Sequence, residues 1–279
     1  MSVAELKEAF ALLGRFPVLW IPGLVAGFLG ALFWVLLNLD GTFFASRLIV
    51  IFGLILLLFI AGMLVLLKNG QGDVKTMFTG GIHYYFRILL PLLVIIFADT
   101  LIFIAGVVVL TASGIPPDAM LMEVLAFAIS VPVFILTIFF DTAAVFEEGR
   151  IFDSIRRSIG IVAARFGEVL RYLILNALLS IVIGFGLLLV WNGLLYDKLA
   201  PLQSYTQIRA FTPTELSTMF GTTGVWITAV VIFVGLFLLI PILYSYKACF
   251  FKKISGNLPI ITQASTTGEY DSKGRWYKY

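Results

Sequence analysis

The chain has 279 residues, of which 61% are hydrophobic and only 13% are charged. Soluble domains contain about 45–50% apolar and about 25% charged residues, so this composition excludes an ordinary soluble fold and indicates an integral membrane protein. The net charge is +3, and the single cysteine, Cys249, excludes an internal disulfide and a cysteine-built metal cluster. The N-terminus lacks the basic start and the cleavage site of a signal peptide, so we expect it to be retained.

Six segments are long and apolar enough to cross a bilayer as helices, which takes about 20 residues each. Each must be helical, because an unpaired backbone group in hydrocarbon costs several kcal/mol. The sequence therefore predicts an all-α, polytopic membrane protein with six transmembrane helices. These are Pro17–Leu37, Val50–Leu67, Ile88–Leu110, Leu121–Phe146, Tyr172–Leu195 and Val225–Tyr244.

Two local motifs predict details of these helices. Gly23 and Gly27 form a G-x-x-x-G in the first span, which permits close approach of a neighbouring helix or of a second copy of the chain. In the connection before the last span, TPTELSTMFG predicts a small helix with Thr212 as its N-cap and Pro213 as its first residue.

The distribution of lysine and arginine predicts the orientation, because cytoplasmic loops carry the excess of these residues. Of the 19 basic residues, 16 fall on one side, with the N-terminus, Lys68–Arg87, Arg150–Arg171 and the tail from Lys247. We therefore expect a multi-pass protein of the cell membrane with both termini in the cytoplasm. Residues 1–248 would form the six-helix transmembrane domain, and residues 249–279 a cytoplasmic tail.

Three stretches share one pattern, in which an amphipathic segment and an aromatic–basic pair precede a span. Each continues into two spans, and similarity at such a period is known from multi-span folds. The pattern is consistent with three repeated units, each an amphipathic cytoplasmic helix and a helical hairpin, but it is also the ordinary composition of interfacial segments. The stretches are ELKEAFALLGRFPVLWIP, DVKTMFTGGIHYYFRILLP and IFDSIRRSIGIVAARFGEVLRYL.

The third of these stretches has the periodicity of a helix that lies in the membrane plane. The polar face of this helix, opposite its apolar face, carries Asp153 and Arg157, which are four residues apart and can pair. We expect Arg150, Arg156 and Arg157 to contact lipid head groups. The apolar face consists of Ile151, Ile155, Ile159, Val162 and Phe166.

The segment from Phe139 to Ser158 resembles the signature of a loose group of multi-span membrane proteins. That group includes the membrane domain of some glycerophosphodiester phosphodiesterases, the bacterial YciC-like proteins and archaeal proteins of unknown function. The ending GEYDSKGRWYKY is similar to archaeal sequences. The resemblance implies a helical membrane domain, and it implies no enzymatic activity, because no catalytic phosphodiesterase domain is present. The matching motifs are Phe139-Phe140-Asp141, Val145, Glu147-Glu148-Gly149 and Ser154-Ile155-Arg156-Arg157-Ser158.

Asp99 is the most notable polar residue within a span, because it lies midway along Ile88–Leu110. A charged carboxylate at the bilayer centre costs about 2.5–3.5 kcal/mol on insertion scales, so Asp99 should face the bundle interior. Thr100, Asn176 and Ser180 are candidate partners that would complete an intramembrane polar site. Two interpretations are open: a neutral interhelical hydrogen bond, and a proton or cation site.

Asp141 is the second ionisable residue within a span, and it lies near the inner interface. It is about 9 Å inside Glu147 at a rise of 1.5 Å per residue. We expect it to lock the fold through an ion pair with an arginine of a neighbouring interfacial helix, either Arg87 or Arg165.

The sequence offers no catalytic, cofactor-binding or metal site. His83 is the only histidine and has no second histidine or thiol beside it, and the nucleotide, hydrolase and metalloprotease motifs are missing. We therefore expect a non-enzymatic scaffold or accessory subunit that packs with membrane lipids, with itself as a homo-oligomer, or with partners of a membrane complex, and that binds no nucleic acid. The alternative is a small-solute or ion transporter. A scaffold would seal Asp99 within protein, whereas a transporter would place it facing a water-filled cavity that is open to one side.

Overall fold

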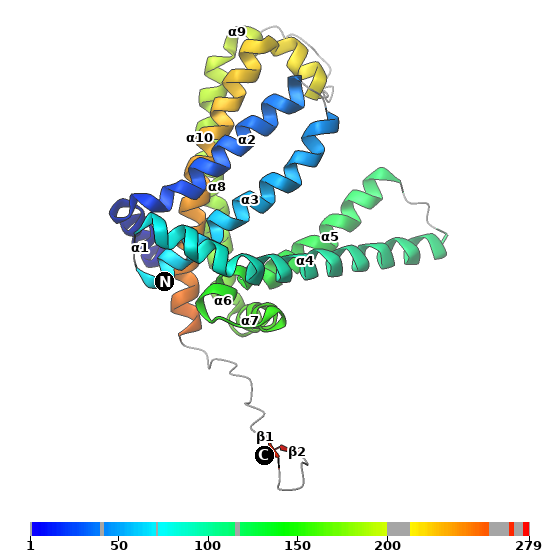
Figure 1. Cartoon of the computed structure of the whole chain (residues 1–279). Coiled ribbons are helices and arrows are strands. Elements are labelled where there is room, and N and C mark those ends of the chain that lie inside the picture. The colour runs from blue at the N-terminus through cyan, green and yellow to red at the C-terminus, as the bar shows by residue number, and fades with distance from the viewer. Residues whose placement is uncertain are drawn as a thin grey trace.

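The structure, a computed structural model, describes residues 2–39, 42–70, 72–114, 118–199, 213–256, 268–270 and 276–278. It confirms the predicted all-α class (Figure 1). The longer elements are α1 (Ser2–Arg15), α2 (Ile21–Leu39), α3 (Thr42–Asn69), α4 (Val74–Ala112), α5 (Ala119–Thr137), α7 (Ile151–Ala164), α8 (Phe166–Leu194) and α10 (Pro213–Ser255). The shorter ones are η1 (Pro17–Trp20), α6 (Phe140–Phe146), α9 (Tyr196–Leu199) and two antiparallel tail strands, β1 (Gly268–Tyr270) and β2 (Trp276–Lys278).

Six helical segments in the described chain are long and apolar enough to cross a membrane, and each overlaps one predicted span. This agrees with the expectation of a multi-pass membrane protein. The segments are Pro17–Asn38, Arg47–Asn69, Val74–Ala112, Ala119–Phe146, Phe166–Leu194 and Gly221–Ser255.

The three amphipathic stretches are all helical, but they are not equivalent. The first and the third form separate helices, α1 and α7. The second continues without a break into its span, so that α4 is one helix of 39 residues. It starts at Val74, directly after Asp73, whose carboxylate accepts a hydrogen bond from the Thr76 N–H at 3.2 Å and thereby caps the helix.

The predicted small helix before the last span is present as the first part of α10. This helix begins at Pro213, and Gly221 interrupts it with φ 62° and ψ −177°. Glycine is favoured at a positive φ because it has no Cβ. Thr212, the predicted N-cap, lies outside the described residues.

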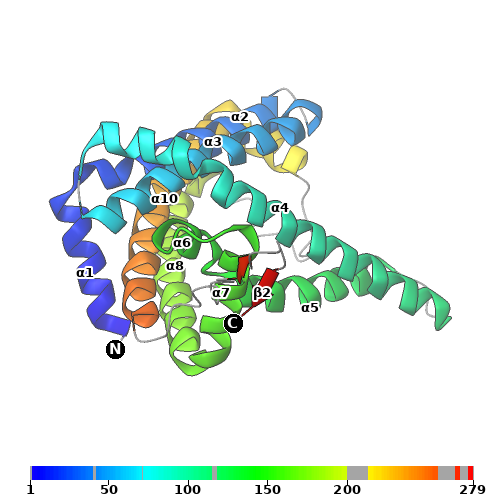
Figure 2. The same cartoon turned by 60° about the horizontal axis from the view of Figure 1, so that its bottom comes forward.

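The helices converge at one end of the molecule, which we call the base: α1, α6, α7, the start of α4 and the end of α10. From the base, the pair α2 and α10 runs in one direction, and the α4–α5 hairpin runs in another (Figures 1 and 2). The hairpin contacts the other elements near the base, through α3, α6 and α7. Most of the buried apolar side chains also lie at or near the base, including Phe139, Tyr172 and Phe251.

The G-x-x-x-G motif of α2 packs against α10 within the same chain. A Cβ atom at Gly23 would lie 2.4 Å from the backbone oxygen of Phe237, and one at Gly27 would lie 2.6 Å from that of Phe233. Real Cβ atoms do not approach an oxygen so closely, so the two backbones can touch only where the side chain is missing. The motif therefore sets the distance between α2 and α10.

We predict that Gly23→Ala lowers the free energy of unfolding by about 1–3 kcal/mol, because the added methyl group forces the two helices apart. Gly184→Ala in α8 is the matched control, since a Cβ there meets nothing within 4 Å. Alanine favours the helix more than glycine does, so this control should be neutral or up to about 1 kcal/mol more stable. Thermal unfolding in detergent, followed by circular dichroism, makes the comparison. Equal shifts in both variants would contradict the packing role.

Candidate functional site

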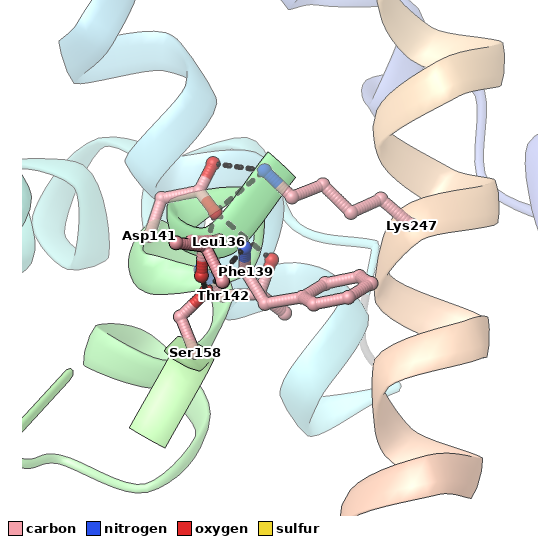
Figure 3. Close-up of polar contacts among 6 residues, drawn as sticks. All are labelled: Leu136, Phe139, Asp141, Thr142, Ser158 and Lys247. Atoms are coloured by element: carbon pink, nitrogen blue, oxygen red, sulfur yellow. Dashed lines mark hydrogen bonds and ion pairs between the residues drawn. The ribbon is translucent and has the colours of Figure 1, made fainter. Parts of the chain in front are cut away.

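The fourth span is broken into α5 and α6, and a serine from α7 repairs the break. The Ser158 hydroxyl donates a hydrogen bond to the Leu136 carbonyl at 2.8 Å and accepts one from the Phe139 N–H at 3.0 Å (Figure 3). Buried backbone groups that lose their helical partner must be satisfied in this way. The break redirects the chain so that the next residues, Phe140 and Asp141, face the interior near α10.

Asp141 forms a buried ion pair with Lys247 of α10 (Figure 3). The Lys247 ammonium lies 2.6 Å from Asp141 Oδ1 and 2.7 Å from Oδ2, and the two residues are only 3% and 9% exposed. The Thr142 N–H also donates to Asp141 Oδ1 at 2.6 Å. The carboxylate is thus paired and hydrogen-bonded, as a buried charge requires.

The predicted partners of Asp141 were wrong, although the prediction of an ion pair at this residue was correct. Arg165 pairs with Glu168, three residues along the chain, with 3.0 Å between Nη1 and Oε1. Arg87 places its guanidinium 5.2 Å from the centre of the Tyr84 ring. The actual partner is a lysine 106 residues away in the chain.

The expectation for the arginines of α7 holds only in part. Arg150 and Arg156 are exposed, so head-group contact stays a prediction for them. Arg157 is only 5% exposed, and its Nε donates to Glu147 Oε1 at 2.9 Å, so it cannot face lipid head groups. Asp153, its predicted partner, instead accepts a hydrogen bond from the Arg150 N–H at 3.2 Å and caps α7.

Glu148 forms a second set of polar contacts at the base, with Lys68 and Tyr84. The Lys68 ammonium and the Tyr84 hydroxyl donate to its Oε1 at 2.7 and 2.8 Å. These two hydrogen bonds lower the pKa of Glu148. Glu148 also has a positive φ of 55°, so the turn between α6 and α7 is held in an uncommon conformation by the side chain's two partners.

Above the base, a cavity of about 470 Å³ lies between the α4–α5 hairpin and the helices α8 and α10. Asp141 and Lys247 lie at one end of it. Asp99 and Ser130 lie farther along the hairpin, and Asn176 of α8 also lines the cavity. On α5, Ser130 and Thr137 both line the cavity, which therefore extends for about 10 Å along this helix at 1.5 Å per residue.

Among the described residues, Asp99 has one hydrogen-bond partner, which sequence reasoning missed. The Ser130 hydroxyl donates to Asp99 Oδ2 at 2.8 Å. Asp99 Oδ1 is buried and has no partner among the described residues, and the same is true of Asn176 Oδ1. Ser130 could have been found, because Asp99 and Ser130 lie at nearly equal distances from the connection between two antiparallel helices.

The other predicted members of the polar site bond within their own helices. Thr100 donates to the Ile96 carbonyl at 2.8 Å, and Ser180 donates to the Asn176 carbonyl at 2.9 Å. Neither lines the cavity. Asn176 does line it, so Asp99, Ser130 and Asn176 share one cavity, whereas a direct contact between Asp99 and Asn176 stays a prediction.

Comparisons of the chain with protein-family models, curated proteins and solved structures find no match. A group of at least three acidic, histidine or cysteine side chains that could hold a metal does not occur in the described part of the chain. The cavity instead offers a carboxylate, an amide, a hydroxyl and an internally neutralised ion pair within apolar walls, which suits reversible binding.

We predict that Arg157→Gln lowers the free energy of unfolding by about 3 kcal/mol, because it removes one partner of a buried ion pair and leaves Glu147 uncompensated. The neighbouring Arg156→Gln is the matched control, since Arg156 is exposed and should change stability by less than about 0.5 kcal/mol. Thermal unfolding of the purified variants measures both. Comparable losses would mean that Arg157 contributes no more than a surface charge.

Proposed function

We propose that the protein is a transporter of a small solute or ion, with Asp99 in the path. The observation that carries this proposal is that Asp99 lines an open cavity, where one of its carboxylate oxygens has no partner among the described residues. Ile96 and Phe134, which line the same cavity, are 52% and 62% exposed, so the cavity opens to the outside of the bundle. A sealed Asp99 would instead have supported the scaffold hypothesis.

The residues around the cavity suggest how a cation would be held. A carboxylate within the bilayer is costly when charged and alone, so binding a proton or a cation at Asp99 lowers that cost. The Ser130 hydroxyl donates to Oδ2 and fixes the carboxylate, and Oδ1 is left to bind. At the other end of the cavity the Asp141–Lys247 pair forms part of the lining, so a solute that moves from Asp99 toward the base would meet this pair.

The scaffold hypothesis keeps one supporting observation, which is the exposure of the α4–α5 hairpin. The helices α4 and α5 project away from the other elements (Figure 2), and many of their apolar side chains are exposed. Membrane lipids, a second copy of the chain or a partner subunit would cover this surface. Exposed examples are Phe97, Val108, Val109, Met120 and Phe127.

We predict that Asp99→Asn abolishes proton or cation flux into reconstituted vesicles, because a neutral amide cannot take up and release charge. The fold should keep nearly all of its stability, since an amide oxygen can still accept from Ser130. Thr100→Ala is the control, because its hydroxyl is exposed and bonds only within α4. A pH-sensitive dye inside the vesicles reports the flux. Flux that persists in Asp99→Asn, or a native protein that gives none above empty vesicles, would favour the scaffold.

We further propose that the base lies on the cytoplasmic side of the cell membrane, as the lysine and arginine distribution indicates. In a Cys249→Ala background, a cysteine at Ser113 between α4 and α5 should react with an impermeant thiol reagent added outside intact cells. A cysteine at Arg150, at the base, should react only after the cells are opened. Both positions are exposed in the structure, so their labelling reports sidedness. External labelling of both would overturn the proposed topology.

A further inference from the structure

The two unpartnered oxygens in the cavity are both hydrogen-bond acceptors. Asp99 Oδ1 belongs to α4 and Asn176 Oδ1 belongs to α8, and both are buried. A carboxylate oxygen and an amide oxygen accept hydrogen bonds and do not donate them. A ligand that satisfies both must therefore bring at least two hydrogen-bond donors. A head group that only accepts, such as a sulfate, would leave both oxygens unsatisfied.

The charge of the cavity specifies the sign of that group. Three charged residues line it, and two of them, Asp141 and Lys247, neutralise each other at 2.6 Å. Asp99 lacks a cationic partner among the described residues of the lining. The bound group should therefore be a cation with N–H donors, which describes a primary ammonium.

The walls and the opening specify the remainder of the ligand. Away from these polar groups the hairpin side of the lining is apolar, and it stays apolar out to the exposed residues Ile96 and Phe134. A volume of about 470 Å³ lies within the range of about 300–1,000 Å³ found for small-molecule pockets. An opening lined in this way favours an alkyl chain over a hydrated ion.

We propose that the ligand of this cavity is an amphiphile with a primary ammonium head group and a hydrocarbon tail. The head would lie between Asp99 and Asn176, and the tail would follow the apolar wall toward Phe134. This inference rests on the proposed transport function and names its substrate class. A quaternary head group fits less well, because it lacks N–H donors, and the Tyr244 ring at the other end of the cavity already has the Lys247 ammonium 5.2 Å from its centre.

The test is binding of dodecylammonium to the purified full-length chain in maltoside detergent, by titration calorimetry and by thermal shift. Dodecyltrimethylammonium lacks the donors, dodecyl sulfate has the opposite charge, and methylammonium lacks the tail. We expect dodecylammonium to bind at least ten times more tightly than each of these. Equal binding of the trimethyl compound, or tighter binding of the sulfate, would overturn the proposal.

Variants locate the binding site within the cavity. Asp99→Asn should weaken dodecylammonium at least tenfold, Asn176→Leu should weaken it severalfold, and the exposed Thr100→Ala should leave it unchanged. If Asp99→Asn does not fold, Asn176→Leu still decides the question, because undiminished binding in that variant contradicts the assignment. Competition by phosphatidylethanolamine would identify the ammonium as that of a lipid head group, whereas binding without such competition would identify a free amine.

Two measurements, dodecylammonium binding and flux into vesicles, distinguish a failure of this inference from a failure of the proposed function. Dodecylammonium that binds through Asp99 to a protein that carries neither protons, cations nor dodecylammonium across the vesicle membrane would support the ligand class and refute transport. Asp99-dependent flux in a protein that does not bind dodecylammonium would support transport and refute the ligand class. Failure of both would refute both.

Discussion

The Asp141–Lys247 ion pair is the interaction on which the arrangement of the helices depends. Burying two charges costs several kcal/mol for each ion, and only close pairing with further hydrogen bonds offsets this cost. Asp141 meets these conditions through Lys247 at 2.6 Å and through the Thr142 N–H. It can reach Lys247 only because α5 ends at Thr137 and α6 starts anew at Phe140. The break is in turn stable only because Ser158 bonds both backbone groups that it frees.

The ion pairs of the base explain why a cavity forms above it. Two of the ion pairs, Lys68–Glu148 and Lys253–Glu5, join residues 80 and 248 positions apart in the chain. A third, Arg157–Glu147, joins α7 to the end of α6, and all three lie near the base. Away from the base, the α4–α5 hairpin has few contacts with the remainder of the molecule. Because the helices are held together at the base and diverge away from it, space remains between the α4–α5 hairpin and the helices α8 and α10. Asp99, Ser130 and Asn176 line this space.

The sequence was sufficient for the features that depend on composition and local spacing, and insufficient for those that depend on distant contacts. Hydropathy located all six spans, because backbone satisfaction in lipid leaves helices as the only choice. Periodicity placed Arg157 among the lipid contacts, because it measures polarity along a helix and not what packs against it. The packed face of α7 includes Ser154, Arg157 and Ser158, which are polar but satisfied. Residue spacing reports only on neighbours along one helix or strand, so it could not identify Lys247, 106 residues away, as the partner of Asp141.

The contrast between the two intramembrane aspartates is the strongest physical argument that Asp99 has a function. Asp141 has a cationic partner and a backbone donor, so its burial is fully compensated within the chain. Asp99 has a single hydroxyl donor, and its other oxygen is buried without a partner in the described structure. A buried polar group left unsatisfied costs about 1–3 kcal/mol, more if it is charged. At a binding residue the ligand supplies the missing donor and recovers that free energy on binding. The same chain thus pairs one carboxylate at the base and leaves the other with an unpartnered oxygen in the described structure, as the proposed binding role of Asp99 requires.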